Sequence, residues 1–488
     1  MRLFRSIIER MAPTPIGEGI RRRSVCLKLN LMTASGAFEG EDLTMNRRKL
    51  LGAALASTAV ATLLASRDCA AQERSTKASR GIPIPKIKDI SVIECAPQGV
   101  RLTVVKVITD QPGLLGYGCA TFTQRADLVK PAVELYLKPL LLGRGVDRVE
   151  DIWQLCYNSS YWRNGPIMNN AISGVDQALW DIKGKMAGMP VYQLLGGKAR
   201  EAVDLYAHAE GTEIAQTIEN ARSFMSQGFR HVRIQVGVPG MSGYGAAHSG
   251  GRIPALHDAP VFEREGYIRR ALALFEQARK DLGEEVELLH DAHERVTPTE
   301  AVRFTKDLEK YRLFFLEDVL SPEDIVWFNN IRQQCATPLA MGELFNSSHE
   351  WTPLIKDRLI DYMRMHLSQM GGLTPARKVA AMGEIFNVRT AWHGPGDVSP
   401  IGHMAMVHLD LNITNFGIQE YTPFNAATRE IFNGVPELKG GYLYANDAPG
   451  WGSEIDEAAA AKHPFTHQDP LNGGWGEIRL PDGQIIKQ

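Results

Sequence analysis

The sequence predicts an α/β protein in which a (β/α)8-type barrel follows an N-terminal α+β capping domain. From Val203 onward, short apolar runs alternate with stretches of helical periodicity, the pattern of repeated strand–helix units. Three of these runs end in an acid, at Asp291, Glu317 and Glu343, and successive acids are 26 residues apart (317 − 291 and 343 − 317). A barrel of this type uses roughly 25–30 residues for each unit, so the spacing predicts three neighbouring parallel strands.

The bulk composition is that of a globular protein with room for more than one domain. The chain has 488 residues, of which 44% are hydrophobic and 23% are charged. A formal net charge of −2 provides no basic field, so neither nucleic acid nor an anionic membrane is expected as a partner. The six cysteines show no C-x-x-C spacing and no zinc-type spacing with histidine, which argues against a thiolate metal site and against a disulfide scaffold.

Residues 1–80 are predicted to be a leader with a twin-arginine-type signal peptide. The pair Arg47-Arg48 precedes an uncharged, mildly apolar stretch of 17 residues from Leu50 to Ser66, which small residues follow. This order is typical of a secretory signal, and the paired arginines indicate the twin-arginine route. The alternative, a permanent membrane anchor, is less favoured because the stretch is short and only mildly apolar. We therefore expect an exported or periplasmic protein without a permanent anchor, translated from Met45.

Residues 81–202 are predicted to form the α+β capping domain. Residues 87–108 alternate apolar and polar side chains across a Pro-Gln-Gly turn, which predicts a β-hairpin, and 115–122 are expected to add a third strand. Helical periodicity follows over 147–153 and 165–189. Strands followed by helices are typical of a small α+β domain.

Residues 203–420 are predicted to form the barrel, and residues 421–488 a C-terminal segment that returns to the cap. The expected strands are 203–206, 230–235, 286–291, 314–317, 339–343, 362–365, 389–393 and 416–420. The expected helices between them include 213–228, 267–282, 298–311, 325–333 and 375–386. Residues 236–261, rich in Gly and Pro, predict a long functional loop.

The three acids at the strand ends predict a metal site. Asp291, Glu317 and Glu343 would meet at the C-terminal mouth of the barrel, where their charges repel one another unless a cation lies among them. Mg²⁺ takes oxygen ligands and keeps coordination sites open for substrate, so it is the expected cofactor. For any single acid, the alternative is a helix cap or a surface ion pair with arginine.

Several stretches of the chain resemble a known family. They are Tyr-Trp-Arg-Asn-Gly-Pro at 161–166, Ala-Leu-Trp-Asp-Ile-Lys at 178–183, Gly-Val-Pro-Gly at 237–240, Leu-His-Asp-Ala-His at 289–293, and Asn-Phe-Gly-Ile-Gln-Glu-Tyr at 415–421. With the cap, the barrel and the three acids, they resemble the enolase superfamily and, within it, the mannonate dehydratase group, which includes relatives labelled starvation-sensing proteins. The resemblance spans about 87–461.

This resemblance implies an enolase-like fold and a reaction. It implies Mg²⁺-dependent dehydration of a sugar acid, an aldonate such as D-mannonate or D-gluconate, to a 2-keto-3-deoxy acid through an enediolate. It also implies a homo-oligomer with a role in carbohydrate catabolism. The alternatives are an acid-sugar epimerase or racemase, and a catalytically weak sugar-acid-binding or sensory protein. An epimerase normally needs a base on each face of its substrate, and no Lys pair supplies one here.

The resemblance also assigns proton-transfer roles. Arg233 and Tyr244 match the couple that removes the α-proton, because a guanidinium beside a tyrosine favours its phenolate. On their own they would be interpreted as a surface ion pair and a solvated loop residue. His293 matches the general acid, and two residues beyond Asp291 on an extended strand end it would point into the mouth. The alternatives for His293 are a further metal ligand or a structural role.

Other strand-end residues match positions that bind substrate in the family. They are His208, Arg364, His393, Asp397 and Glu420. Asp318 follows Glu317 directly and would point the opposite way on an extended strand, so we expect it to be structural, as we do Glu294.

The chain departs from the family at positions near the predicted pocket. Thr123 and Cys119 stand where the family commonly has Asn and Asp, and Pro395 and Gly396 stand where Ala and Thr are usual. The Trp-rich C-terminal tail of the family is replaced by 483–488. These changes leave the predicted catalytic set intact, so they bear on which sugar acid binds rather than on the type of reaction.

Overall fold

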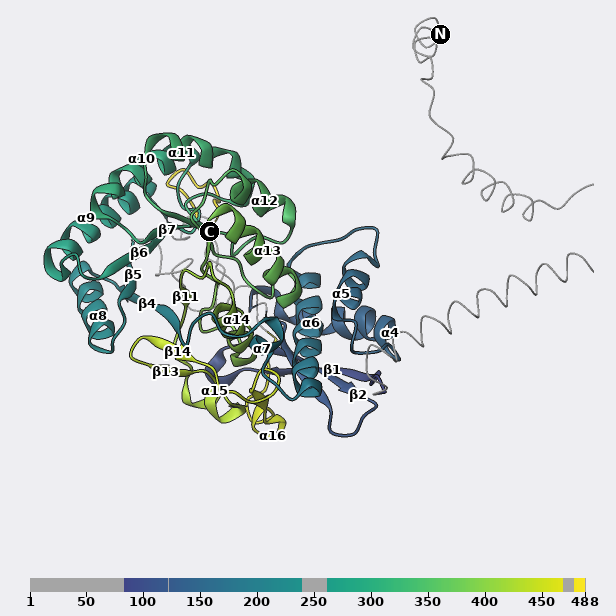
Figure 1. Cartoon of the computed structure of the whole chain (residues 1–488). Coiled ribbons are helices and arrows are strands. Elements are labelled where there is room, and N and C mark those ends of the chain that lie inside the picture. Colours follow the sequence, from purple (N-terminus) through teal and green to yellow (C-terminus); the bar gives the residue numbers. More distant parts are fainter. Residues whose placement is uncertain (1–82, 122, 239–260, 468–477, 488) are drawn as a thin grey trace, which may run out of the picture. The chain divides into compact units, whose positions relative to one another are not determined.

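The computed structural model describes residues 83–121, 123–238, 261–467 and 478–487 (Figure 1). One compact body spans Ile84–Gln488, and within it a small sheet with helices precedes a barrel. The predicted signal peptide lies outside the described residues, as does most of the predicted long loop at 236–261.

The capping domain begins with the predicted hairpin. Strands β1 (Ile87–Cys95), β2 (Leu102–Thr109) and β3 (Leu115–Cys119) form an antiparallel sheet in the order β1-β2-β3. The turn between β1 and β2 is the 3-10 helix η3 (Pro97–Gly99). The helical segments that follow are η4 (Thr123–Leu128), α3 (Val129–Pro131), η5 (Ala132–Leu137), α4 (Lys138–Leu141), α5 (Val149–Asn158), α6 (Pro166–Ala187) and α7 (Val191–Leu195).

Glycines let helix α6 lie directly on the capping sheet. A Cβ atom at Gly118 of β3 would stand 2.0 Å from the carbonyl oxygen of Gly174 on α6, far inside van der Waals contact. At Gly116 the same addition would meet the carbonyl oxygen of Ala178 at 2.2 Å. Only glycine permits this approach of two backbones, so these residues fix where α6 crosses β3.

Eight parallel strands form the barrel, as predicted. They are β4 (Val203–Gly211), β5 (His231–Val236), β6 (Glu287–Asp291), β7 (Phe315–Glu317), β8 (Leu339–Met341), β9 (Tyr362–Met363), β10 (Arg389–Thr390) and β11 (Gln419–Glu420). The last strand β11 pairs with the first strand β4, and a parallel bridge from Thr390 to Phe416 closes the remaining gap. Strands β8 to β10 are shorter than expected, because the chain leaves the ladder before the predicted site residues Glu343, Arg364 and His393, whereas β11 begins later than expected and ends at Glu420.

Helices surround these strands (Figure 1). They are α8 (Ile214–Ser226), α9 (Arg264–Leu282), α10 (Pro298–Leu308), η6 (Glu309–Tyr311), η7 (Pro322–Trp327), α11 (Phe328–Gln334), α12 (Ser348–Lys356), α13 (Leu373–Phe386) and α14 (Pro400–Asn412). Helix α10 shows how the local sequence determines a helix. A capping box between Thr297 and Glu300 begins it, and Ala301, Phe304 and Leu308 are buried at helical spacing. None of the described helices is long and apolar enough to span a bilayer.

The C-terminal segment contacts both parts of the fold. Its elements are α15 (Ala426–Ile431), β12 (Phe432–Asn433), β13 (Glu437–Lys439), β14 (Tyr442–Tyr444), β15 (Glu454–Ile455) and α16 (Glu457–Ala460). Trp451 reaches the cap, where its backbone N–H donates to Asp181 at 2.9 Å and its indole N–H donates to the Tyr117 carbonyl at 3.2 Å. Strand β14 instead pairs with β4 of the barrel.

The predicted position of residues 478–487 was wrong. They were expected to return to the cap with the rest of the segment, but they lie on the barrel. The Phe262 N–H donates to the Arg479 carbonyl at 2.8 Å, and the Lys487 ammonium donates to the Ser321 hydroxyl at 2.6 Å and contacts Glu323 at 3.1 Å. The acidic side chain of Glu323, after β7, therefore attracts Lys487 near the C-terminus.

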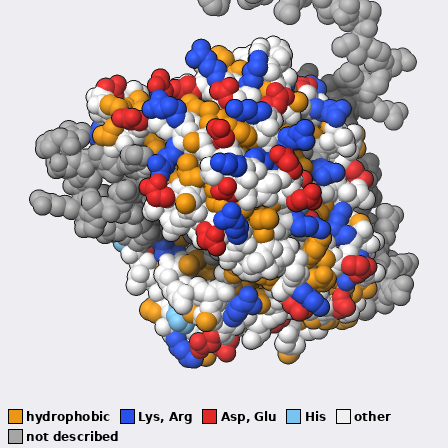
Figure 2. Space-filling view, turned by 90° about the vertical axis from the view of Figure 1, so that its left-hand side faces the viewer, with side chains coloured by type: hydrophobic (Ala, Val, Ile, Leu, Met, Phe, Trp, Pro, Cys, Tyr) orange, Lys and Arg blue, Asp and Glu red, His pale blue; other side chains and the backbone are white. Residues whose placement is uncertain are grey.

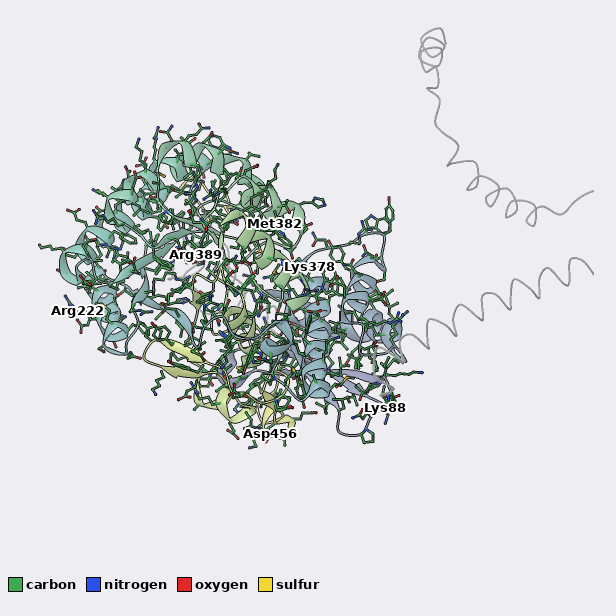
Figure 3. All side chains as sticks on the ribbon, viewed as in Figure 1. Lys88, Arg222, Lys378, Met382, Arg389 and Asp456 are labelled. Carbon is green, nitrogen blue, oxygen red and sulfur yellow. The ribbon has the colours of Figure 1, made fainter. Side chains whose placement is uncertain are left out.

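A buried carboxylate on α6 fixes the cap to the barrel. Asp176 accepts hydrogen bonds from the backbone N–H and the hydroxyl of Thr374, in the first turn of α13, where the helix dipole favours a negative charge. An ion pair between Glu150 and Lys378 joins a second helix of the cap, α5, to α13 nearer the surface, where Figure 3 labels Lys378.

We expect Asp176 to make stability depend on pH. Burial raises the pKa of Asp176 from 3.8 to about 7, so between those values the folded protein holds a proton that the unfolded chain has lost. Its contribution is fully present below about pH 4 and is lost as pH rises towards 7, by at most roughly 4 kcal/mol. In Asp176→Asn, the loss of unfolding free energy between pH 5 and pH 8 should be smaller than in the wild type. Urea unfolding measures it, with the exposed Asp151→Asn as control, and equal slopes for Asp176→Asn and the wild type would contradict the assignment.

The outer helices carry charges of both signs. On the face shown in Figure 2, lysine and arginine side chains alternate with aspartate and glutamate, and no large patch of one sign is visible. The mixture fits the small net charge of the whole chain.

Candidate active site

The C-terminal ends of the barrel strands bring charged side chains together. In the ladder, His208 of β4 lies beside Arg233 of β5, and Asp291 of β6 lies beside Glu317 of β7. Glu420 ends β11, which pairs with β4. Because neighbouring parallel strands end at the same rim, five charged or polar groups from distant parts of the sequence share one mouth.

Two buried arginines contact the three predicted metal ligands. The Arg233 guanidinium lies 2.9 Å from Asp291 and 3.8 Å from Glu317. The Arg364 guanidinium lies 2.5 Å from Glu317 and also contacts Glu343. Glu343 belongs to two groups of possible ligand atoms that lie within 4.8 Å of one another, one with Asp291 and His293 and one with Glu317 and Asp318.

The charge balance of this cluster suits a divalent cation. Asp291, Glu317, Asp318, Glu343 and Glu420 carry five formal negative charges, against two positive charges on Arg233 and Arg364 (−5 + 2 = −3). Burial raises the pKa of Glu343 to about 7 and that of Glu317 well above its usual range. Although burial also opposes ionisation of Asp291, His293 and Arg233 hold the pKa of Asp291 below its usual range. Crowded carboxylate oxygens with excess negative charge are the donors that Mg²⁺ prefers.

His293 lies on the Asp291 carboxylate. Its Nε2 atom is 2.7 Å from Asp291 Oδ2, and its backbone N–H donates to Asp291 Oδ1 at 2.9 Å. The predicted position in the mouth rested on an extended strand end, and that reasoning was wrong: His293 and Glu294 have φ values of 45° and 55°. The chain turns here because the Asp291 side chain accepts the His293 N–H. Burial lowers the pKa of His293 to about 4, while Asp291 acts to raise it.

Asp318 also departs from its predicted orientation. It was expected to point away from Glu317 by strand alternation, but its φ of 40° takes it out of the extended region. Its carboxylate instead joins those of Glu317 and Glu343. The alternation rule fails because β7 ends at Glu317, one residue earlier.

Two residues of the site were missed in the sequence. The Tyr206 hydroxyl accepts a hydrogen bond from Arg364 at 3.1 Å and donates one to Glu317 at 3.4 Å. Its position two residues before His208 on one strand could have revealed it. Arg295, only 3% exposed, lies 3.4 Å from Nδ1 of His293. Since arginine only donates, Nδ1 accepts and the His293 proton is on Nε2, facing Asp291. Arg295 stands in a polar stretch that is typical of an exposed turn, so the sequence does not predict its burial.

Three predicted substrate-binding residues form one ion-pair network. His208 Nε2 lies 2.7 Å from Glu420 Oε1, and its Nδ1 lies 3.2 Å from the Arg233 guanidinium. Arg364 lies 2.6 Å from the other Glu420 oxygen. Glu420 is therefore held from two sides, and the network fixes the positions of both arginines.

His393 contacts the same Glu343 oxygen as Arg364 does. Its Nε2 atom is 3.4 Å from Glu343, and its ring is 4.9 Å from that of His366, another residue that the sequence did not single out. Asp397 lies half-buried on the loop that follows β10, four residues beyond His393. Pro395 and Gly396 of the same loop are also half-buried.

Other predicted residues lie apart from this cluster or outside the described chain. Tyr244, the predicted base, is among the residues outside the described ranges. Cys119, expected near the pocket, is buried under α14, where a Cβ atom at Gly402 would stand 2.9 Å from its sulfur. Like the other three cysteines in the described part of the chain, it is a free thiol.

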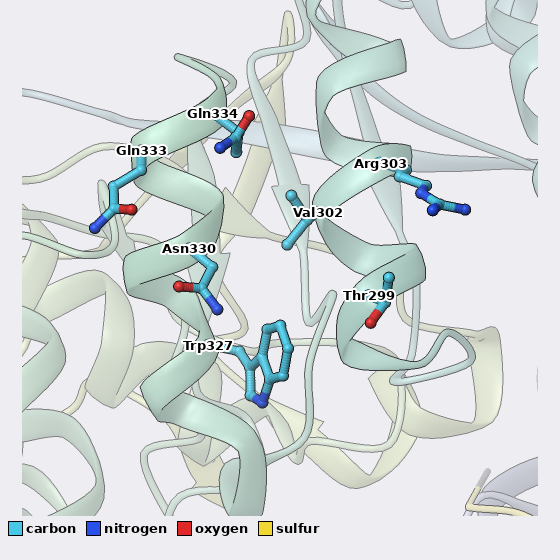
Figure 4. Close-up of a pocket in the computed structure, with 7 residues that line it drawn as sticks. All are labelled: Thr299, Val302, Arg303, Trp327, Asn330, Gln333 and Gln334. Carbon is cyan, nitrogen blue, oxygen red and sulfur yellow. The ribbon is translucent and has the colours of Figure 1, made fainter.

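A separate groove lies on the outer surface, between α10 and the η7–α11 segment (Figure 4). Its lining residues are Thr299, Val302, Arg303, Trp327, Asn330, Gln333 and Gln334. None of these belongs to the cluster at the strand ends, so the groove is distinct from the candidate active site.

An α+β cap on a (β/α)8 barrel, with acids, arginines and a histidine at the strand ends, defines an enolase-type protein. The chain belongs to the mandelate racemase/muconate lactonizing enzyme family of the enolase superfamily. The N-terminal domain of that family matches residues 86–196, and the enolase C-terminal domain-like family matches residues 216–459. The predicted fold and superfamily are thereby confirmed.

Several known proteins are similar over most of the chain. A D-galactonate dehydratase family member of Pantoea ananatis is 50% identical over 412 residues, 82% of this chain and 98% of that protein. A crystal structure of an enolase from Pantoea ananatis, with bound D-gluconate and Mg, is 49% identical with a TM-score of 0.78, covering 83% of this chain and 100% of that chain. An enolase-superfamily member from Salmonella Typhimurium shares the fold at 24% identity, with a TM-score of 0.69 over 78% and 99% of the two chains.

Proposed function

We propose that this protein is a Mg²⁺-dependent dehydratase of a sugar acid, an aldonate such as D-mannonate or D-gluconate, with a 2-keto-3-deoxy acid as product. The observation that carries the proposal is the pairing of His293 with Asp291 inside the carboxylate cluster. The similar Pantoea ananatis structure with D-gluconate and Mg supports the same substrate class and metal.

Asp291, Glu317 and Glu343 would hold the metal. Bound Mg²⁺ supplies positive charge to a substrate carboxylate, which makes the neighbouring α-proton more acidic. Arg233 and Arg364, both buried, hold the carboxylates in place and act against burial by favouring their ionised form. Arg233 and Arg364 would also orient the carboxylate of a sugar acid that enters the mouth of the barrel.

The proton transfers are assigned to residues of this chain. Tyr244 is the proposed base for the α-proton, and the family resemblance pairs it with Arg233, whose guanidinium would favour its phenolate. His293 is the proposed acid: in its imidazolium form it would donate the Nε2 proton to the departing hydroxyl and return to neutral imidazole. Burial lowers the pKa of His293, and an anion bound at the mouth would raise it again towards the value that an acid requires.

The choice among sugar acids is proposed to depend on the loop after β10. His393 and Asp397 flank Pro395 and Gly396 on the loop after β10, so these two departures from the mannonate dehydratase group lie between two proposed substrate-binding residues. An epimerase or a weakly active binding protein would use the same carboxylate cluster. We also expect a homo-oligomer.

A panel of aldonic acids tests the proposal. Purified protein with Mg²⁺ should convert at least one of them into a 2-keto-3-deoxy acid, detected by its carbonyl group. Formation of an epimer would favour the epimerase, and tight binding without product would favour the binding protein. Either result would overturn the proposed dehydratase.

We also propose export through the twin-arginine route. A protein translated from Met45 should reach the periplasm, whereas the double variant Arg47→Lys, Arg48→Lys should remain in the cytoplasm. Cell fractionation measures this, and the variant Lys49→Arg, which keeps the charge and the arginine pair, is the control. Unchanged export of the double variant would contradict the route.

A further inference from the structure

Asp318 is held in an unusual backbone conformation directly after a predicted metal ligand. Its φ is 40°, which non-glycine residues seldom adopt. Its backbone N–H donates to Ala340 at 3.0 Å, and its carbonyl accepts from Glu294 at 2.8 Å, so two neighbouring strand ends fix the turn. The residue is 2% exposed.

The two oxygens of the Asp318 carboxylate have different surroundings. Oδ1 accepts the Gly342 N–H at 3.1 Å. Oδ2 is buried and has no hydrogen-bond donor among the described residues. The carboxylate also lies in the group with Glu317 and Glu343, whose ligand atoms are all within 4.8 Å of one another. A buried anionic oxygen without a donor, beside two further acids, is costly unless a cation lies close to it.

A purely structural role does not require a charge at this position. The bond to Gly342 needs one acceptor oxygen, which asparagine also has, and asparagine is among the residues that best tolerate a positive φ. The aspartate thus adds a negative charge and an unpaired oxygen that the turn itself does not use.

We propose that Asp318 is a fourth carboxylate of the cation site, with Oδ1 fixed by Gly342 and Oδ2 serving the bound divalent cation or its water. The inference rests on the proposed function for the identity of the cation as Mg²⁺. It assigns the second acid of the Glu317-Asp318 pair to metal binding rather than to the fold.

The variant Asp318→Asn separates the two roles, because its amide oxygen still accepts from Gly342 while the second oxygen becomes a neutral NH₂ group. Calorimetric titration with Mg²⁺, and with Mn²⁺ as a second probe, should show affinity at least ~10-fold weaker than in the wild type. Without metal, the melting temperature should be unchanged or higher, and Mg²⁺ should raise it less. Asp324→Asn, in η7, removes the same charge outside the cluster and should bind Mg²⁺ normally.

The outcomes are distinct. Wild-type affinity for Mg²⁺ in Asp318→Asn would overturn the inference and leave the proposed function standing. Absence of Mg²⁺ binding by the wild-type protein would overturn the proposed function, and the inference with it. If Asp318→Asn does not fold, the same calorimetric titration with Mg²⁺ is made on Asp318→Gly, because glycine accommodates the positive φ.

Discussion

Replacing His293 by Asn is expected to stop dehydration while the α-proton of the substrate still exchanges with deuterated solvent. Asparagine keeps a polar side chain next to Asp291 but cannot donate the proton that the departing hydroxyl needs. Loss of a positioned acid should lower dehydration by at least ~100-fold. Tyr244→Phe should instead abolish both dehydration and exchange, because the phenolic oxygen is the proposed base.

Proton NMR in D₂O measures exchange, and product formation measures dehydration. Exchange in His293→Asn requires that the abstracted proton reaches solvent before it returns. His349→Asn and Tyr136→Phe, both at exposed positions, are matched controls and should behave as the wild type. Exchange that survives in Tyr244→Phe would mean that another group, such as His293, removes the proton, and the two roles would have to be reassigned.

Replacing Glu317 by Gln is expected to weaken Mg²⁺ binding and abolish turnover while the barrel stays folded. Glu317 is fully buried, contacts Arg364 at 2.5 Å and accepts from Tyr206. Glutamine preserves the size and one oxygen but removes the anionic charge. Since even indirect partners of a metal ligand contribute 10–100-fold to affinity, the loss for a direct ligand should be at least ~100-fold.

Calorimetry with Mg²⁺ measures this affinity, and circular dichroism checks the fold. The surface variant Glu219→Gln on α8 changes the same charge on an exposed side chain and is the control. If Glu317→Gln bound Mg²⁺ as tightly as the wild type, the assignment of the acids at the strand ends as metal ligands would fail.

The sequence predicted those parts of the fold that repeat. The 26-residue spacing of Asp291, Glu317 and Glu343 located three strands, because a barrel repeats one unit and each unit ends at the same rim. The hairpin of the cap followed from alternation around the Pro97–Gly99 turn. Regular periodicity depends only on residues that are close in sequence, so a single sequence is enough to detect it.

What escaped prediction depends on irregular backbone at the ends of strands. The positive φ values of His293 and Asp318 break the alternation on which their orientations were predicted. The burial of Arg295 and the contact of Tyr206 with Arg364 depend on distant segments. No local pattern reports such contacts, because they form only when the strands have been assembled.

The closure of the barrel also determines when the protein can fold during its synthesis. Gln419 of β11 pairs with Leu205 of β4, 214 residues earlier (419 − 205), and Trp451 reaches back to Asp181. Until the ribosome has released nearly the whole chain, β4 therefore has an unpaired edge, and such edges can pair with other chains. Whatever forms earlier, the barrel can close only after β11 has been synthesised. A chaperone that covers β4 on the ribosome would protect the segment exposed for the longest time.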